Sequence, residues 1–88
     1  MITINVVNED QGDLFVSVTD LNRAGSPIVV NKVRINEGDS LPVEVQEDGH
    51  GNGKMTWAAL RVDFPEKTVH RTVTVGSGDT VEVTTFFG

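Results

Sequence analysis

Residues 68–87 read TVHRTVTVGSGDTVEVTTFF, and this stretch decides the fold class. Apolar residues recur at every second position on both sides of the GSGD segment, which is the pattern of half-buried β-strands. Val and Thr dominate the stretch, and both residue types favour pleated surfaces. Gly and Asp between the two runs are typical of a tight turn, so we expect a hairpin of strands 68–75 and 80–87. Within the first strand, Arg71 shares the inward side with the valines and is expected at the rim.

The same alternation recurs through the rest of the chain and predicts five further strands, at residues 2–7, 14–20, 28–35, 41–47 and 55–63. Polar turns rich in Gly, Asn, Asp or Pro separate them. No stretch of ten or more residues has the apolar spacing of an amphipathic helix. The sequence therefore predicts an all-β fold, a small antiparallel β-sandwich of about seven strands, with residues 1–88 as a single domain.

Two of the predicted strands are irregular. The apolar positions of residues 28–35 change parity in mid-strand, which predicts a β-bulge near residues 31–32. The alternative is two short strands in different sheets that join at this point. A similar change within residues 55–63 predicts a second bulge near residues 58–59. Proline has no N–H to donate to a sheet, so Pro42 predicts either an edge strand or the start of a strand. The first strand is the other candidate edge.

A weak internal repeat gives two alternatives for the architecture. Residues 35–40, INEGDS, resemble residues 75–80, VGSGDT, and each segment leads into Val-Glu-Val. Either residues 14–47 and 55–85 form two packed three-stranded meanders, or the similarity reflects only shared turn chemistry. The strand-rich pattern with its GDTVEV ending resembles immunoglobulin-like and fibronectin-like modules in general. That resemblance implies an immunoglobulin-like sandwich, although the chain has no cysteine.

The composition excludes several classes of function. The chain has 13 acidic and 7 basic residues and a net charge of −6, which disfavours binding to nucleic acid or to anionic membranes. No apolar run approaches the roughly 18 residues that a membrane span needs. The N-terminus lacks the pattern of a signal peptide, and a chain that begins with Met1 is expected in the cytoplasm by default.

The central segment, residues 47–54, reads EDGHGNGK and is the first candidate for a polar site. Asp48 and Asn52 stand where a calcium-binding loop places oxygen ligands. His50 is a poor calcium ligand, and Ala59 stands where such a loop has its bidentate Glu. We therefore expect no cofactor and keep calcium as the alternative. If neither applies, the segment is a glycine-rich connection between strands.

Other polar residues have two interpretations as well. Glu9, Asp10 and Asp13 cluster in the first turn, either as a solvated turn or as a weak cation site. Trp57, the sole tryptophan, is expected to anchor the core rather than to stack on a ligand. Phe86 and Phe87 are adjacent, so one of them is expected to face outward.

The sequence contains no motif that pairs a nucleophile with a base and no phosphate-binding loop, so it does not predict an enzyme. In an immunoglobulin-like order, the turns at residues 21–27, 47–54 and 76–79 gather at one end, which would also present Asp20 and Arg23. The sequence thus predicts a non-catalytic recognition module, with carbohydrate as the candidate ligand. The alternative is a structural protein that oligomerises through edge strands. Expected partners are a protein, a second copy or a glycan. The predicted ligand-binding residues are Asn22, Asp48, His50, Asn52 and Asp79.

Overall fold

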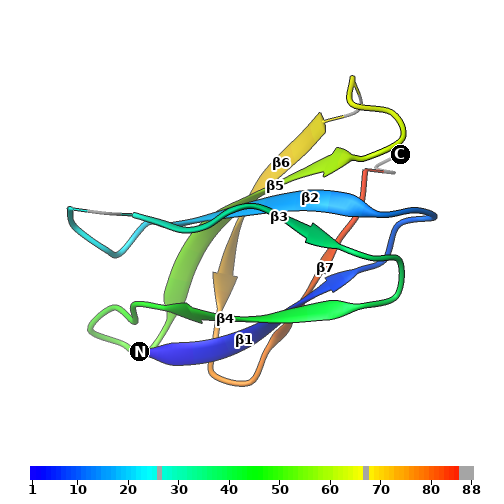
Figure 1. The fold of residues 1–88 in the computed structure, drawn as a ribbon. Helices are drawn as coiled ribbons and strands as arrows, with labels where there is room; N and C mark the ends of the chain where they lie inside the picture. Colours follow the sequence, from blue (N-terminus) through cyan, green and yellow to red (C-terminus); the bar gives the residue numbers. More distant parts are fainter. Residues whose placement is uncertain (26, 67, 86–88) are drawn as a thin grey trace.

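The computed structural model describes residues 1–25, 27–66 and 68–85 and shows seven strands in two facing sheets (Figure 1), with no helix in these ranges. One sheet has the order β4-β1-β7 and the other has the order β3-β2-β5-β6. The predicted all-β sandwich is therefore confirmed. The strands are β1 (Ile2–Asn8), β2 (Leu14–Asp20), β3 (Ile28–Ile35), β4 (Ser40–Val45), β5 (Gly53–Arg61), β6 (Thr68–Val75) and β7 (Thr80–Val83).

Alternate residues of β1, β2, β4, β5 and β7 fill the space between the sheets. Trp57 is the largest buried side chain and is only 2% exposed, which confirms it as the core anchor. A valine, leucine or isoleucine that is fully buried contributes roughly 1.5–3 kcal/mol, so a core of this kind supports a small domain without disulfides. The buried aliphatic residues include Ile4, Val6, Leu14, Val16, Val18, Val45 and Val83.

The connections cross between the sheets more often than the sequence indicates. β4 leaves the β2–β3 hairpin and pairs with β1, and β7 leaves β6 and pairs with β1 on its other side. The hairpin predicted for residues 68–87 is not formed, because β6 and β7 belong to different sheets and do not pair. The two-meander hypothesis is therefore wrong, because neither half of the chain stays within one sheet. The β1–β7 pair is parallel, unlike the other pairs. The division of strands also differs from an immunoglobulin domain, where the second and third strands lie in different sheets.

The edge strands agree only partly with expectation. β4, which contains Pro42, is an edge as predicted, but the first strand lies between β4 and β7. In β1, Ile2, Ile4 and Val6 face the core while Thr3 and Asn5 face outward. That alternation does not distinguish a central strand of an antiparallel sheet from an edge. The remaining edges are β3, β6 and β7.

One of the two predicted bulges is present. On β2, Val16 and Val18 are two residues apart, whereas their partners on β3, Val33 and Val30, are three apart. The extra residue lies at positions 31–32, where Lys32 has a φ of 49°. This confirms the first bulge.

The second predicted bulge is absent. β5 pairs with β2 and with β6 in unbroken register. Trp57 and Ala59 face the core, while Leu60 and Val62 are half-buried on the alternate parity. The prediction failed because both faces of β5 are at least partly buried, so apolar residues occur at odd and at even positions without a bulge.

The last glycine of the central segment belongs to the core. Gly53 is buried as the first residue of β5. A Cβ at this position would lie 2.7 Å from Val45 Cγ2 and 3.1 Å from both Ile2 Cδ1 and Val75 Cγ2. The glycine is therefore required by the close approach of the two sheets.

We predict that Gly53→Ala lowers the free energy of unfolding by about 1–3 kcal/mol, because an extra methyl group overpacks a filled core. Gly49→Ala is the matched control, since a Cβ there has no neighbour within 4 Å. Urea unfolding of both variants measures the difference. Equal stabilities for the two variants would contradict the close packing at Gly53.

Candidate functional site

The turns that follow β2, β4 and β6 lie at one end of the sandwich. Asp20, the last residue of β2, pairs with Met55 near the start of β5, and Gly53 pairs with Val75 at the end of β6. The N-terminus of β1 lies at this end too, beside the β4–β5 turn (Figure 1). The predicted gathering of turns is thus present, although it arises from a different strand order.

The β4–β5 turn is closed by its own hydrogen bonds. The Asp48 amide donates to the Asn52 carbonyl at 2.7 Å, and a β-bridge joins Glu47 to Gly53. Asp48 Oδ1 accepts hydrogen bonds from the amides of His50 (2.7 Å) and Asn52 (3.1 Å). The bond from the Asn52 amide, with that from His50, holds the pKa of Asp48 below its ordinary value. The carboxylate thus serves the shape of the turn.

Asn22 connects two of the turns. Its Nδ2 donates to the carbonyl of Gln46 at 3.1 Å and to that of Asn52 at 3.3 Å. The structure therefore brings Asn22 close to Asn52, as a site would require. Asp79 makes its contacts elsewhere: its Oδ2 accepts from the Gly76 amide at 2.7 Å within the turn between β6 and β7.

Asp20 is not presented at this end, contrary to expectation. It is fully buried, and its Oδ2 accepts a hydrogen bond from the Gln46 amide at 2.6 Å. Its Oδ1 accepts from the Asn22 amide at 3.1 Å, which is an Asx-turn. Asp20 thus links β2 to the segment that follows β4 in the other sheet. An Asp at a strand end, two residues before an Asn, is the only signal in the sequence for this role.

The acids of the first turn do not form a cation site. Asp10 is buried, and its Oδ2 accepts from the amide (2.7 Å) and the hydroxyl (2.6 Å) of Thr85. Asp13 instead pairs with Arg34 at 2.5 Å, while Glu9 is exposed. Within residues 1–25, 27–66 and 68–85, no three His, Cys, Asp or Glu side chains are arranged to hold a metal ion.

Asp10 gives the fold a specific sensitivity to acid. Burial raises the pKa of Asp10, but the bonds from Thr85 and from the Gln11 amide lower it more, so the pKa lies below its ordinary value. A carboxyl group whose pKa is lower in the folded state than in the unfolded state adds stability above the unfolded pKa. That stability is lost as pH falls through the folded pKa.

We predict that Asp10→Ala costs about 1–3 kcal/mol of unfolding free energy at neutral pH, because it leaves buried donors of Thr85 unpaired. The difference from the wild type should narrow as pH falls below about 5. Urea unfolding across this range measures it, with Glu9→Ala as the exposed neighbouring control. A difference that stays constant with pH would show that the charge on Asp10 is unimportant.

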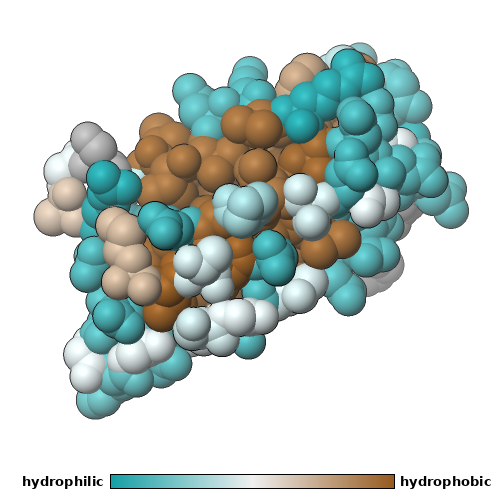
Figure 2. Space-filling view, turned by 60° about the horizontal axis from the view of Figure 1, so that its bottom comes forward, coloured by the Kyte–Doolittle hydropathy of each residue, from teal (hydrophilic) through white to brown (hydrophobic). Residues whose placement is uncertain are grey.

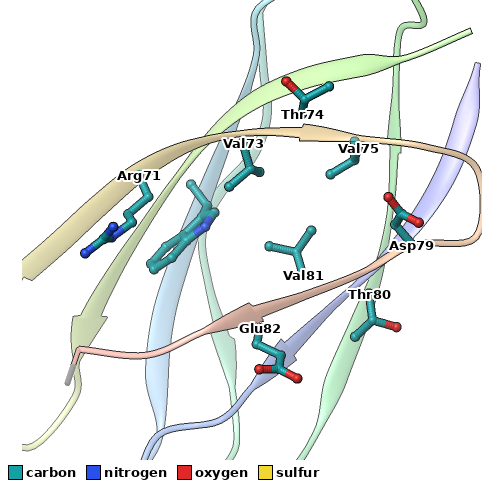
Figure 3. A pocket seen from close by; sticks show the side chains of 9 residues that line it. Arg71, Val73, Thr74, Val75, Asp79, Thr80, Val81 and Glu82 are labelled. Carbon is teal, nitrogen blue, oxygen red and sulfur yellow. The ribbon is translucent and has the colours of Figure 1, made fainter. Parts of the chain in front are cut away.

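A groove lies between β6 and β7, where the edge of one sheet faces the edge of the other. Its volume is about 330 Å³. Figure 3 shows Val73 and Val75 of β6 directed toward Val81 of β7 across the groove, with Arg71 farther along β6. Trp57 lies in the lining as well. Arg71 is exposed, which agrees with its predicted position at the rim.

The opposite side of the sandwich is open between β3 and β4. Ile28 is 59% exposed and Val33 is 39% exposed on β3, and Leu41 of β4 is only partly buried. Figure 2 shows a broad apolar area on the molecule in the view that brings its lower side forward. A hollow beside this strip is bordered by Arg23 and Glu44. We call Ile28, Val33 and Leu41 the β3–β4 strip.

Comparison with known proteins finds no match: no protein-family model, no curated protein and no solved structure resembles the chain closely enough to be reported. Among the described residues, no helix has the length and hydropathy to cross a membrane. Phe86 and Phe87, one of which was expected to face outward, lie outside the described residues.

Proposed function

We propose that this protein is a non-catalytic structural module that assembles with a second copy through the β3–β4 strip. The observation that carries the proposal is the exposure of Ile28 and Val33 on β3, together with the incomplete burial of Leu41 on β4. A contiguous apolar surface rimmed by polar residues is typical of a protein–protein contact. A second copy supplies an apolar surface of the same kind.

The charges around the strip favour a two-fold arrangement. Arg23 and Lys32 lie on the β3 side, and Glu44 lies on the β4 side. A two-fold axis that lies in the interface and runs along the strands places the β3 side of one copy against the β4 side of the other. Basic side chains then face an acidic one twice across the same interface, which favours this pairing over others.

The backbones of β3 and β4 oppose simple sheet extension at this side. The bulge at residues 31–32 interrupts β3. On β1, Asn5 donates its N–H to the Asp79 carbonyl in the turn between β6 and β7, so Pro42, opposite Asn5, directs its nitrogen away from β1. That outer position of β4 therefore has no donor. Side-chain packing of the strip, and not an added strand, makes the contact.

We predict that the wild-type chain forms a dimer in sedimentation velocity experiments and that Ile28→Glu shifts it to monomer, because a buried carboxylate would face the partner. Phe64→Glu is the matched control, since Phe64 is 53% exposed at the far end of the sandwich. The control should sediment like the wild type. A wild type that is monomeric over the whole accessible concentration range would refute the proposal.

A glycan-binding function at the turn end is the second candidate. The observation that favours it is the hydrogen bonding of Asn22 to the turn that carries Asp48, His50 and Asn52. Polar side chains on a braced turn are suited to sugar hydroxyl groups. Trp57 does not contribute a stacking surface to this end, because it is in the core.

This second function predicts binding on a glycan array that His50→Ala weakens, since His50 is exposed on the turn. The array is probed with and without calcium. Gly49→Ala serves as the control, because it alters the same turn without a steric contact. Absence of binding in both conditions removes the candidate.

A further inference from the structure

β6 is a regular edge strand in this structure. All eight residues from Thr68 to Val75 pair with β5 without a break in register. Within the described residues, the order β3-β2-β5-β6 leaves the other side of β6 without a neighbouring strand. The strand contains no proline and is rich in Thr and Val, which suit a pleated surface.

The hydrogen-bonding groups on the free side of β6 can be assigned from the ladder. The Leu21 amide donates to Lys54, and the Val62 amide donates to Asp13, so the even-numbered residues of β5 point their backbone groups toward β2. Backbone groups alternate in direction along a strand of an antiparallel sheet. The odd-numbered residues of β5 therefore bond to β6. The residues of β6 whose N–H and C=O point outward are Thr68, His70, Thr72 and Thr74.

The other edges carry features that block strand addition. β3 has a bulge with Lys32 at positive φ, β4 has Pro42 at an outward position, and β7 is only four residues long. β6 has none of these three features. β6 is therefore the edge where an added strand can form backbone hydrogen bonds with four successive alternate residues, from Thr68 to Thr74.

A strand added to the free edge of β6 would lie next to the groove between β6 and β7. The inward side chains of β6, Arg71, Val73 and Val75, form one wall of the groove (Figure 3). A strand paired with β6 would direct every second side chain toward this wall and toward Val81 of β7. Main-chain pairing combined with pockets for alternate side chains is a common mode of peptide recognition.

The charge of β6 indicates the chemistry of the partner. The strand carries His70 and Arg71 and no acid, in a chain whose net charge is −6. Two copies of β6 in antiparallel pairing would place their Arg71 side chains directly or diagonally opposite each other, which is unfavourable. An acidic residue opposite Arg71 is favourable. The charge thus selects a different strand over a second copy of β6.

We propose that β6 binds an extended segment of another protein as an added antiparallel strand. The segment has the pattern apolar-x-apolar-x-acidic, with its apolar residues opposite Val75 and Val73 and its acidic residue opposite Arg71. This surface is separate from the β3–β4 strip, so the two proposals stand or fall independently.

The test uses two synthetic peptides, TVTVTET and TVTVTKT, titrated into the ¹⁵N-labelled protein and followed by NMR. The first peptide should shift the amide signals of Thr72 and Thr74 and the indole signal of Trp57, and it should bind more tightly than the second. Opposite charges across a strand pair contribute about a two- to five-fold difference in affinity. Arg71→Glu should reverse the preference.

Two further variants separate this site from the dimer contact. Thr72→Pro removes an outward N–H without removing a bond to β5 and should abolish binding. Ile28→Glu should leave peptide binding unchanged. The proposal is overturned if neither peptide shifts the amide signals of β6, or if the shifted signals belong to β3 instead. It is also overturned if Arg71→Glu still binds the Glu-containing peptide more tightly than the Lys-containing one. Because Arg71 is exposed, Arg71→Glu remains informative if Thr72→Pro does not fold.

Discussion

The packing of two sheets around Trp57 is the constraint on which the rest of the structure depends. With 88 residues and no cysteine, the chain has no disulfide to help offset the loss of conformational entropy on folding, so the buried core carries most of that task. The close approach of the sheets at Gly53 follows from this requirement. The chain also crosses repeatedly between the sheets, so both halves of the sequence contribute strands to each sheet and side chains to the core.

Buried carboxylates fix the two ends of the sandwich. Asp20 joins the β2 end to Gln46 in the other sheet, and Asp10 joins the first turn to Thr85. Each of these buried side chains accepts hydrogen bonds from backbone amides, which offsets the cost of removing its oxygen atoms from water. Part of the acidic composition of the chain is therefore structural, and the net charge alone does not indicate a ligand.

The sequence predicted the strands well because period-two alternation reports directly which face of a strand is buried. The strands at 14–20, 28–35 and 68–75 have the predicted bounds, and the bulge at residues 31–32 follows from the same rule. Alternation carries no information about which strand is the neighbour. The central place of β1 and its parallel pairing with β7 could not be predicted for that reason.

The candidate site was less predictable than the fold. The gathering of three turns was expected, but the use of Asp20 and Asn22 to brace those turns depends on hydrogen bonds between residues more than 20 positions apart. The surfaces best suited to contact, the β3–β4 strip and the edge of β6, depend on pairing order. Sequence alternation alone therefore could not indicate them.

The central functional claim is that a second copy covers the β3–β4 strip. An isotope-filtered NOE experiment on a mixture of labelled and unlabelled protein tests it most directly. We expect contacts between the Ile28 and Val33 methyl groups of one copy and the Leu41 methyl groups of the other. Intermolecular contacts confined to other surfaces, or none at concentrations where the chain is dimeric, would contradict it.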